Sequence, residues 1–132
     1  MKESRSLMIL VAGPYRSGTN DNPQLIAANV KAMTDTTLEI YRMGHLPVLG
    51  EWFALPLIEA AGSKETGDDV FNEIFHPVAI QLIDHCDAVL RIGGPSAGAD
   101  EMVQTGIKKG KIIFRDKKEI PVVKKATLPS PN

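Results

Sequence analysis

The chain has 132 residues, a length typical of one domain with its own hydrophobic core. Its 15 Lys and Arg and 16 Asp and Glu give a formal charge of −1, which excludes the positive field of a protein that binds nucleic acid polymers or anionic membranes. Cys86 is the single cysteine, so there is no disulfide framework or cysteine-based metal site. Residues 7–12 are too few for a membrane span or a signal sequence, and we expect a cytoplasmic protein.

The first third of the chain predicts a buried strand, a polar loop and a long helix. Residues 7–12 are apolar and stop at a Gly-Pro pair, which is typical of a strand covered on both faces. The turn-rich loop 15–21 follows, and Asn22 with Pro23 favours a helix start, because Asn caps and Pro fits the first helical position. Gly44 ends the helix. Three- and four-residue spacing predicts one apolar face on it, made of Ile26, Val30, Met33, Ile40 and Tyr41.

A second strand and an interrupted helix are expected next. Residues 45–50 predict a short strand, which Pro47 places at a sheet edge or a strand start. Residues 51–61 are rich in apolar and aromatic side chains and predict a short helix interrupted near Pro56. Segment 62–67 is the best candidate for a mobile loop or a lid.

A second long helix begins at Asp68 or Asp69, either of which is a suitable cap. Its apolar residues lie four apart and are Val70, Ile74, Val78 and Leu82. Pro77 lies inside this pattern and is expected to kink the helix or split it in two. Residues 88–92 then form a third buried strand.

The last third predicts a glycine-rich turn, a helix and a strand. The turn covers 93–98, the helix runs from 99 to 109, and the strand covers 111–115. The ends of the chain, 1–6 and about 122–132, predict flexible tails, although the second could instead dock on a partner subunit.

Strands that alternate with helices predict an α/β fold with a parallel sheet. We expect residues 1–132 to form a single domain with a small doubly wound, flavodoxin-like sheet of four to five strands. The expected strand order is 2-1-3-4, with helices on both faces. In such sheets ligands bind at the carboxyl ends of the strands, which brings loop 13–18 and turn 93–98 to the same crevice.

This crevice predicts a site for an anionic or hydroxyl-rich ligand. Glycines let a ligand approach the backbone, and the helix after Gly98 directs free N–H groups and its positive dipole end toward the same place. Tyr15 is a candidate catalytic residue in the first loop. The candidate ligand contacts in the two loops are Gly13, Pro14, Arg16, Ser17, Gly94, Ser96 and Gly98.

Two carboxylates are candidates for chemistry at the crevice. Glu101 lies in the first turn of the last helix, where it could face the pocket or serve as an ordinary helix-cap acid. Glu51, directly after the second strand, is the other candidate. Asp100 projects about 100° away around the helix and is expected to face solvent. Asp87, at the base of the third strand, is expected to have a structural role.

Aromatic residues near the crevice could hold a planar base. Tyr15 is well placed for this, and Trp52 and Phe53 could join it or could belong to the core or to an interface.

No metal site or cofactor is expected. The three histidines, His45, His76 and His85, lack metal-ligand spacing and are expected at helix ends or on the surface.

Three short motifs resemble the nucleoside 2-deoxyribosyltransferase-like superfamily. They are Ala12-Gly13-Pro14-Tyr15 after the first strand, Cys86-Asp87 at the start of the third, and Ser96-Ala97-Gly98 before a helix. Arg42 to Val48 also resembles the small bacterial members. The resemblance spans about residues 7 to 121. A fainter one links 93–101 to the phosphoribohydrolases that release cytokinins.

The resemblance implies cleavage of an N-glycosidic bond in a nucleoside or nucleotide. In these enzymes a Glu after the Ser-x-Gly turn attacks the anomeric carbon of the sugar, as in retaining glycosidases. Counted from Ser96, that Glu position falls on Met102, one residue after Glu101. The Asp that often ends the third strand in the family is replaced here by Gly93-Gly94-Pro95.

Three hypotheses follow. The first is a deoxyribosyltransferase or nucleoside (or nucleoside monophosphate) hydrolase with Glu101 as nucleophile and with Tyr15 and Ser96 positioning the substrate. The second is a binding domain for a nucleotide or nucleoside derivative that has lost the catalytic Glu. The third is an interaction domain whose oligomer face carries Trp52 and Phe53. The resemblance implies a homo-oligomer in any case, because relatives complete their sites with residues of a neighbouring subunit.

Overall fold

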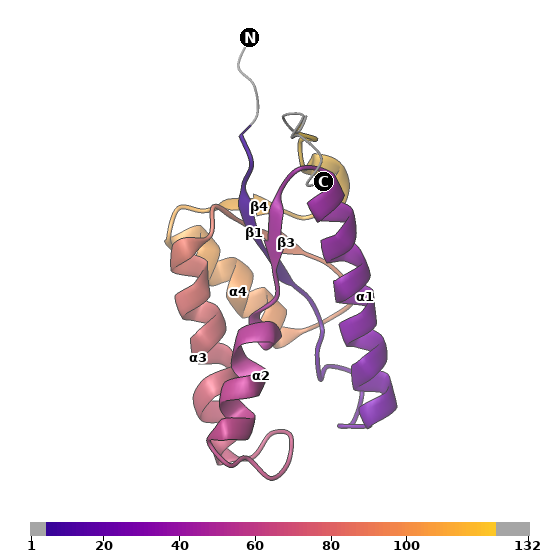
Figure 1. Cartoon of the computed structure of the whole chain (residues 1–132), viewed down its shortest axis with the longest axis vertical. Helices are drawn as coiled ribbons and strands as arrows, with labels where there is room; N and C mark the ends of the chain where they lie inside the picture. Colours follow the sequence, from indigo (N-terminus) through magenta and orange to yellow (C-terminus); the bar gives the residue numbers. More distant parts are fainter. Residues whose placement is uncertain (1–4, 124–132) are drawn as a thin grey trace, which may run out of the picture.

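The computed structural model describes residues 5–123 and shows a four-stranded parallel sheet in the order β2-β1-β3-β4 (Figure 1). The strands are β1 (Met8–Ala12), β2 (Leu46–Val48), β3 (Ala88–Arg91) and β4 (Ile112–Phe114). In the register, Ile9 lies opposite both Pro47 and Ala88. The α/β class and the strand order 2-1-3-4 are therefore confirmed, and Pro47 does lie in an edge strand, where its missing N–H costs no ladder hydrogen bond.

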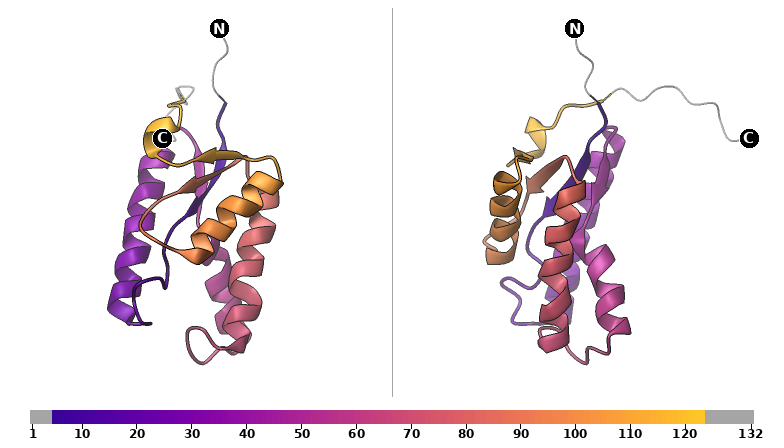
Figure 2. Two further views of the ribbon diagram at one scale, coloured as in Figure 1. Left: turned by 180° about the vertical axis from the view of Figure 1, so that it is seen from behind. Right: turned by 90° about the vertical axis from the view of Figure 1, so that its left-hand side faces the viewer.

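Helices surround this sheet. They are α1 (Pro23–Arg42), α2 (Gly50–Ala60), α3 (Asp69–His85), α4 (Ala97–Lys108) and the 3₁₀ turn η1 (Lys117–Glu119). Within residues 5–123, no helix is both long enough and apolar enough to cross a membrane. Helices α2 and α3 form a hairpin that extends past the carboxyl ends of the strands (Figures 1 and 2).

The alternating side chains of β1 divide the core into two layers. Ile9 and Val11 pack with Met33 and Ile40 of α1 on one face of the sheet. Leu10 and Ala12 pack on the other face in a cluster with residues of α3 and α4, including Ile83, Met102 and Val103. Figure 2 shows the sheet between these layers. Both faces of the central strands are buried, which explains why their sequences are apolar throughout.

The ends of α1 form as the sequence predicts. Asn22 accepts hydrogen bonds from the N–H groups of Gln24 and Leu25, at 2.9 and 3.3 Å. Gly44 follows the helix with a φ of +99°, a backbone conformation that favours glycine. The prediction that Tyr41 belongs to the buried face is wrong, because its side chain is 52% exposed. Thr37 is buried there instead, three residues before Ile40.

The two helical prolines do not break their helices. Helix α2 runs through Pro56 and α3 through Pro77, so the predicted interruption of the first and the splitting of the second are wrong. Both prolines are exposed on the outer sides of a tightly packed helix pair, where the carbonyl groups that lose their N–H partners can face water. In α3 the predicted apolar residues are only half-buried, and Phe71 and Ile83 are the fully buried ones.

The chain returns to the β2 edge of the sheet after η1. His45, which is 3% exposed, accepts a hydrogen bond from the N–H of Leu7 at 3.0 Å and donates one to the carbonyl of Pro121 at 2.7 Å. Of the two places expected for His45, it occupies the helix end, just after α1, and it is buried there. Most of the predicted tails, residues 1–4 and 124–132, lie outside the described residues.

Candidate functional site

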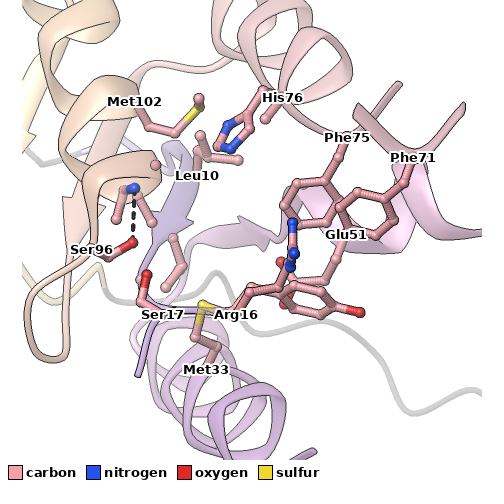
Figure 3. A pocket seen from close by; sticks show the side chains of 18 of the residues that line it. Leu10, Arg16, Ser17, Met33, Glu51, Phe71, Phe75, His76, Ser96 and Met102 are labelled. Carbon is pink, nitrogen blue, oxygen red and sulfur yellow. Dashed lines mark hydrogen bonds between the residues drawn. The ribbon is translucent and has the colours of Figure 1, made fainter. Parts of the chain in front are cut away.

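A cavity of about 180 Å³ opens at the carboxyl ends of the strands (Figure 3). It is lined by β1, the loop after β1, the start of α2, the middle of α3 and the start of α4. Seven of the predicted site residues line it, namely Gly13, Tyr15, Arg16, Ser17, Glu51, Ser96 and Gly98. Four others do not, namely Pro14, Trp52, Gly94 and Glu101. The rule that places ligand sites at strand ends thus located the cavity.

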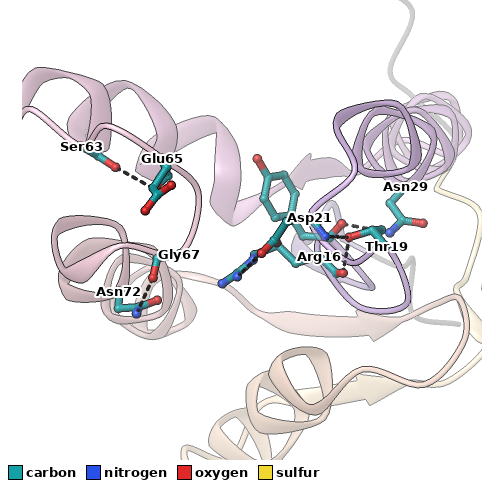
Figure 4. Close-up of polar contacts among 9 residues, drawn as sticks. Arg16, Thr19, Asp21, Asn29, Ser63, Glu65, Gly67 and Asn72 are labelled. Atoms are coloured by element: carbon teal, nitrogen blue, oxygen red, sulfur yellow. Dashed lines mark hydrogen bonds and ion pairs between the residues drawn. The ribbon is translucent and has the colours of Figure 1, made fainter.

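The loop after β1 is held in shape by its own polar groups (Figure 4). Asn29 of α1 donates a hydrogen bond to the carbonyl of Tyr15 at 2.9 Å, and the hydroxyl of Thr19 donates one to the carbonyl of Arg16 at 2.5 Å. Asn20 and Asp21 have φ values of +51° and +57°, which these two residue types tolerate better than most. The loop therefore presents Tyr15 and Arg16 to the cavity in a defined orientation.

Arg16 connects this loop to the segment between α2 and α3. Its guanidinium pairs with both carboxylate oxygens of Asp21, at 2.8 and 3.0 Å, and lies 5.5 Å from the ring centre of Phe71. A Cβ at Gly67 would lie 2.5 Å from Nη2 of Arg16, so the guanidinium rests directly on the glycine backbone. The bond with Asp21 raises the pKa of Arg16, and the same pair lowers the pKa of Asp21. Arg16 is thus a fixed cation at the rim of the cavity.

The predicted loop 62–67 is organised by Asp68, the residue that follows it. This carboxylate accepts hydrogen bonds from the hydroxyl of Ser63 and from the N–H groups of Lys64 and Glu65, at 2.8, 2.9 and 3.3 Å. It also caps α3 by accepting from the N–H of Phe71 at 2.9 Å, as predicted. These bonds, that of Phe71 first, lower the pKa of Asp68 to about 2.

Three aromatic rings form one wall of the cavity. The ring centres of Tyr15 and Phe75 are 4.9 Å apart, and those of Phe71 and Phe75 are 4.8 Å apart. Trp52 and Phe53 take no part, because both are 45% exposed and neither lines the cavity or joins the core. Of the roles considered for these two residues, their exposure agrees with an interface and their position does not agree with a wall of this cavity. The signal for the actual wall was the four-residue spacing of Phe71 and Phe75, which puts both on one face of a helix.

Glu51 is the carboxylate that the cavity contains. It lies in the first turn of α2, is 6% exposed, and its Oε2 has no hydrogen-bond partner within residues 5–123. Burial raises the pKa of Glu51, and a bond from its own backbone N–H offsets part of that rise. Burial, followed by the charge of Glu51, raises the pKa of Tyr15.

The prediction that Glu101 faces the pocket is wrong. Helix α4 starts at Ala97, where Ser96 caps it by accepting from the N–H of Ala99 at 3.1 Å. Its buried face then consists of Ala99, Met102, Val103 and Gly106. Glu101 is exposed to solvent, and the next residue, Met102, lines the cavity.

Two aspartates have the roles that the sequence predicts. Asp100 is exposed to solvent and pairs with the Nε of Arg91 at 3.0 Å. Asp87 accepts from the N–H of Met8 at 2.8 Å and pairs with Arg5, and the bond from Met8 is the main cause of its lowered pKa. Neither residue lines the cavity.

His76 is a site residue that the sequence reasoning missed. It was expected at a helix end or on the surface, yet it lies in the middle of α3 and lines the cavity. Its ring contacts Phe75 edge-on, with centres 5.5 Å apart, and packs against Gly98 at the start of α4.

A metal centre finds no support in the described part of the chain. Within residues 5–123, no group of three or more His, Cys, Asp or Glu side chains could hold an ion. Cys86 is buried in the core, as expected, and burial raises its thiol pKa to about 11.

A scan against protein-family models gave no match, and a search of the curated proteins found no similar sequence.

Proposed function

We propose that the protein is an enzyme that cleaves the N-glycosidic bond of a (deoxy)nucleoside or nucleoside monophosphate, with Glu51 as the carboxylate nucleophile. One observation carries the proposal: a buried carboxylate with an unpaired oxygen lines a cavity that has an aromatic wall. Burying an unpaired carboxylate is costly, so the arrangement favours a ligand that uses it. The residues that resemble deoxyribosyltransferase-like proteins, above all the Gly-Pro-Tyr loop and the Ser-x-Gly turn, point to the same substrate class.

The walls of the cavity suit the parts of a nucleoside. A planar base can pack against the rings of Tyr15 and Phe75, where stacking contributes about 1 kcal/mol beyond area burial. The sugar then lies toward Glu51. The start of α4, capped by Ser96, offers free N–H groups to a hydroxyl or a phosphate.

In the proposed reaction Glu51 acts as its carboxylate. One carboxylate oxygen bonds to the anomeric carbon while the bond from that carbon to the base breaks, and the base takes the electron pair and a proton. Water then attacks the glycosyl ester, which releases the sugar and restores the carboxylate. A second base in place of water gives transfer.

A nucleoside-binding domain without turnover is the second candidate. The observation that favours it is Met102, which is 5% exposed and supplies an apolar side chain where the resembling enzymes have their Glu. This candidate uses the same cavity and leaves Glu51 as a hydrogen-bond acceptor for a ligand hydroxyl.

We also propose that the chain self-associates through α2. This helix exposes Trp52, Phe53 and Leu57 by 45%, 45% and 52%. Exposed apolar side chains gathered on one helix are typical of an interface, and we expect a second copy of the chain to cover this patch.

The test is to incubate the purified protein with mixed deoxynucleosides and nucleoside 5′-monophosphates and to measure free base by chromatography. If the wild type releases base and Glu51→Gln does not, the enzyme hypothesis is supported. Glu101→Gln is the matched control, because that carboxylate is exposed and its loss should leave base release unchanged. No release, together with a nucleoside-dependent rise in melting temperature, supports the binding domain. If neither occurs, both candidates are wrong.

A further inference from the structure

His76 and Glu51 lie on different walls of one cavity (Figure 3). Glu51 comes from the first turn of α2, and His76 comes from the middle of α3, beside the start of α4. A substrate that fills the cavity contacts both side chains. The Glu51 carboxylate supplies a nucleophile but no proton for the leaving base.

The His76 ring is held in place by packing. Phe75 meets it edge-on, at an interplanar angle of 89°. On another side, a Cβ at Gly98 would lie 2.5 Å from Cε1 of His76 and 3.1 Å from Nε2. The ring therefore occupies the space that any larger residue at position 98 would need. Its Nε2 edge is at the start of α4.

Both ring nitrogens of His76 are available to a ligand. Within residues 5–123, no protein group forms a hydrogen bond with either of them. His45 is the contrast, since one of its nitrogens accepts from Leu7 and the other contacts the carbonyl of Pro121. A half-buried imidazole fixed by packing but free of hydrogen bonds is suited to proton transfer.

The charged and titratable groups around His76 are few. Tyr15 and Arg16 face the cavity from the loop after β1, and Glu51 faces it from α2. The lining residues from α4 and α1 carry no charge; they are Ser96, Gly98, Ala99, Met102 and Met33. Arg16 is already paired with Asp21. Among the lining residues, Glu51 is thus the acidic side chain that shares the cavity with His76.

We propose that His76 is a second catalytic residue, the general acid that protonates the leaving base. This role rests on the proposed function. As the bond to the anomeric carbon breaks, its electron pair goes to the base, and the proton of the imidazolium goes to a base nitrogen. When water later attacks the glycosyl ester, its proton returns to the imidazole, the remaining hydroxyl bonds to the sugar, and Glu51 leaves as a carboxylate. The net reaction is nucleoside plus water to base plus sugar.

The experiment compares wild type, His76→Asn and His85→Asn across pH, with a deoxynucleoside that the wild type cleaves. His85 is the matched control because it lies exposed in the last turn of the same helix. Removing a general acid should lower kcat about 100-fold or more. It should also abolish the fall in kcat/KM at alkaline pH, because that fall reports loss of the imidazolium proton. His85→Asn should match the wild type.

A second substrate separates proton donation from a structural role. A 7-methylguanine deoxynucleoside carries its positive charge before cleavage and leaves without being protonated, so His76→Asn should lower its kcat less than threefold. Gly98→Ala, whose Cβ would lie 2.5 Å from Cε1 of His76, should displace the ring and reproduce the selective loss. Equal losses on both substrates, or an unchanged alkaline limb in His76→Asn, would overturn the role of His76 alone. Absence of base release by the wild type would overturn the proposed function itself.

Discussion

Replacing Glu51 by Gln should stabilise the protein at neutral pH. The carboxylate is 6% exposed, and its Oε2 has no hydrogen-bond partner within residues 5–123. A buried polar group without a partner costs about 1–3 kcal/mol. Gln keeps the size of the side chain and removes the charge, so we expect a gain of about 1–2 kcal/mol in the free energy of unfolding. For a chain of this length that corresponds to a rise of about 3–10 °C in melting temperature.

The gain should depend on pH in a defined direction. Because the folded protein raises the pKa of Glu51, it holds this proton more tightly than the unfolded chain does. The stabilising contribution of the protonated carboxyl is complete below the ordinary glutamate pKa, and it is lost as pH rises through the folded pKa. The difference between Glu51→Gln and wild type should therefore be small near pH 4 and should grow toward pH 7.

Urea denaturation of both proteins between pH 4 and pH 8 measures this difference. Glu59→Gln is the matched control, since it removes an exposed carboxylate from the same helix and should change stability little. If Glu51→Gln lowers stability, or if the gain does not change with pH, the argument from desolvation is wrong. A gain in stability together with a loss of base release is the combination expected of a functional carboxylate.

Three further predictions concern the rim of the cavity and the surface. Asp68→Ala should lower the melting temperature, and Asp68→Asn should lower it less, because Asn still caps a helix. Because the pKa of Asp68 is about 2, its contribution to stability should persist above pH 4 and be lost as pH falls through 2. Gly67→Ala should displace the guanidinium of Arg16 and raise KM more than it lowers kcat in steady-state kinetics, and it should also lower the melting temperature, because the φ of +87° at this position disfavours alanine. Trp52→Ala should weaken concentration-dependent association in analytical ultracentrifugation, and a monomeric wild type would contradict the proposed α2 interface.

The fold could be predicted from the sequence because its signals are local. Apolar runs marked the strands, and Asn22 and Asp68 marked two helix starts through the caps that they form. Alternation of strands and helices then predicted a parallel sheet, and the order 2-1-3-4 is that of a small doubly wound sheet. The prolines misled the prediction because their cost depends on exposure. That exposure is a tertiary property, and Pro56 and Pro77 both lie on outer faces.

The site was predictable only where it follows directly from a strand. Gly13, Tyr15 and Glu51 lie just beyond strand ends, so the topology alone places them at the cavity. The contributions of α3 and α4 depend on where each helix begins and on which face it turns inward. A shift of one residue moves a side chain about 100° around a helix, and this separates Glu101 from Met102.

Met102 is the residue at which the two candidate functions can be separated. Met102→Glu places a second carboxylate in the cavity that already holds Glu51. Two carboxylates in one site oppose each other's ionisation, so the pKa of Glu51 should rise further. If Glu51 is the nucleophile, base release at pH 7 should fall, and the acid limb of kcat/KM should move to higher pH. A variant that releases base when the wild type does not would show instead that Met102 accounts for the missing activity of the natural chain. Wild-type and variant profiles measured on one deoxynucleoside decide between these outcomes.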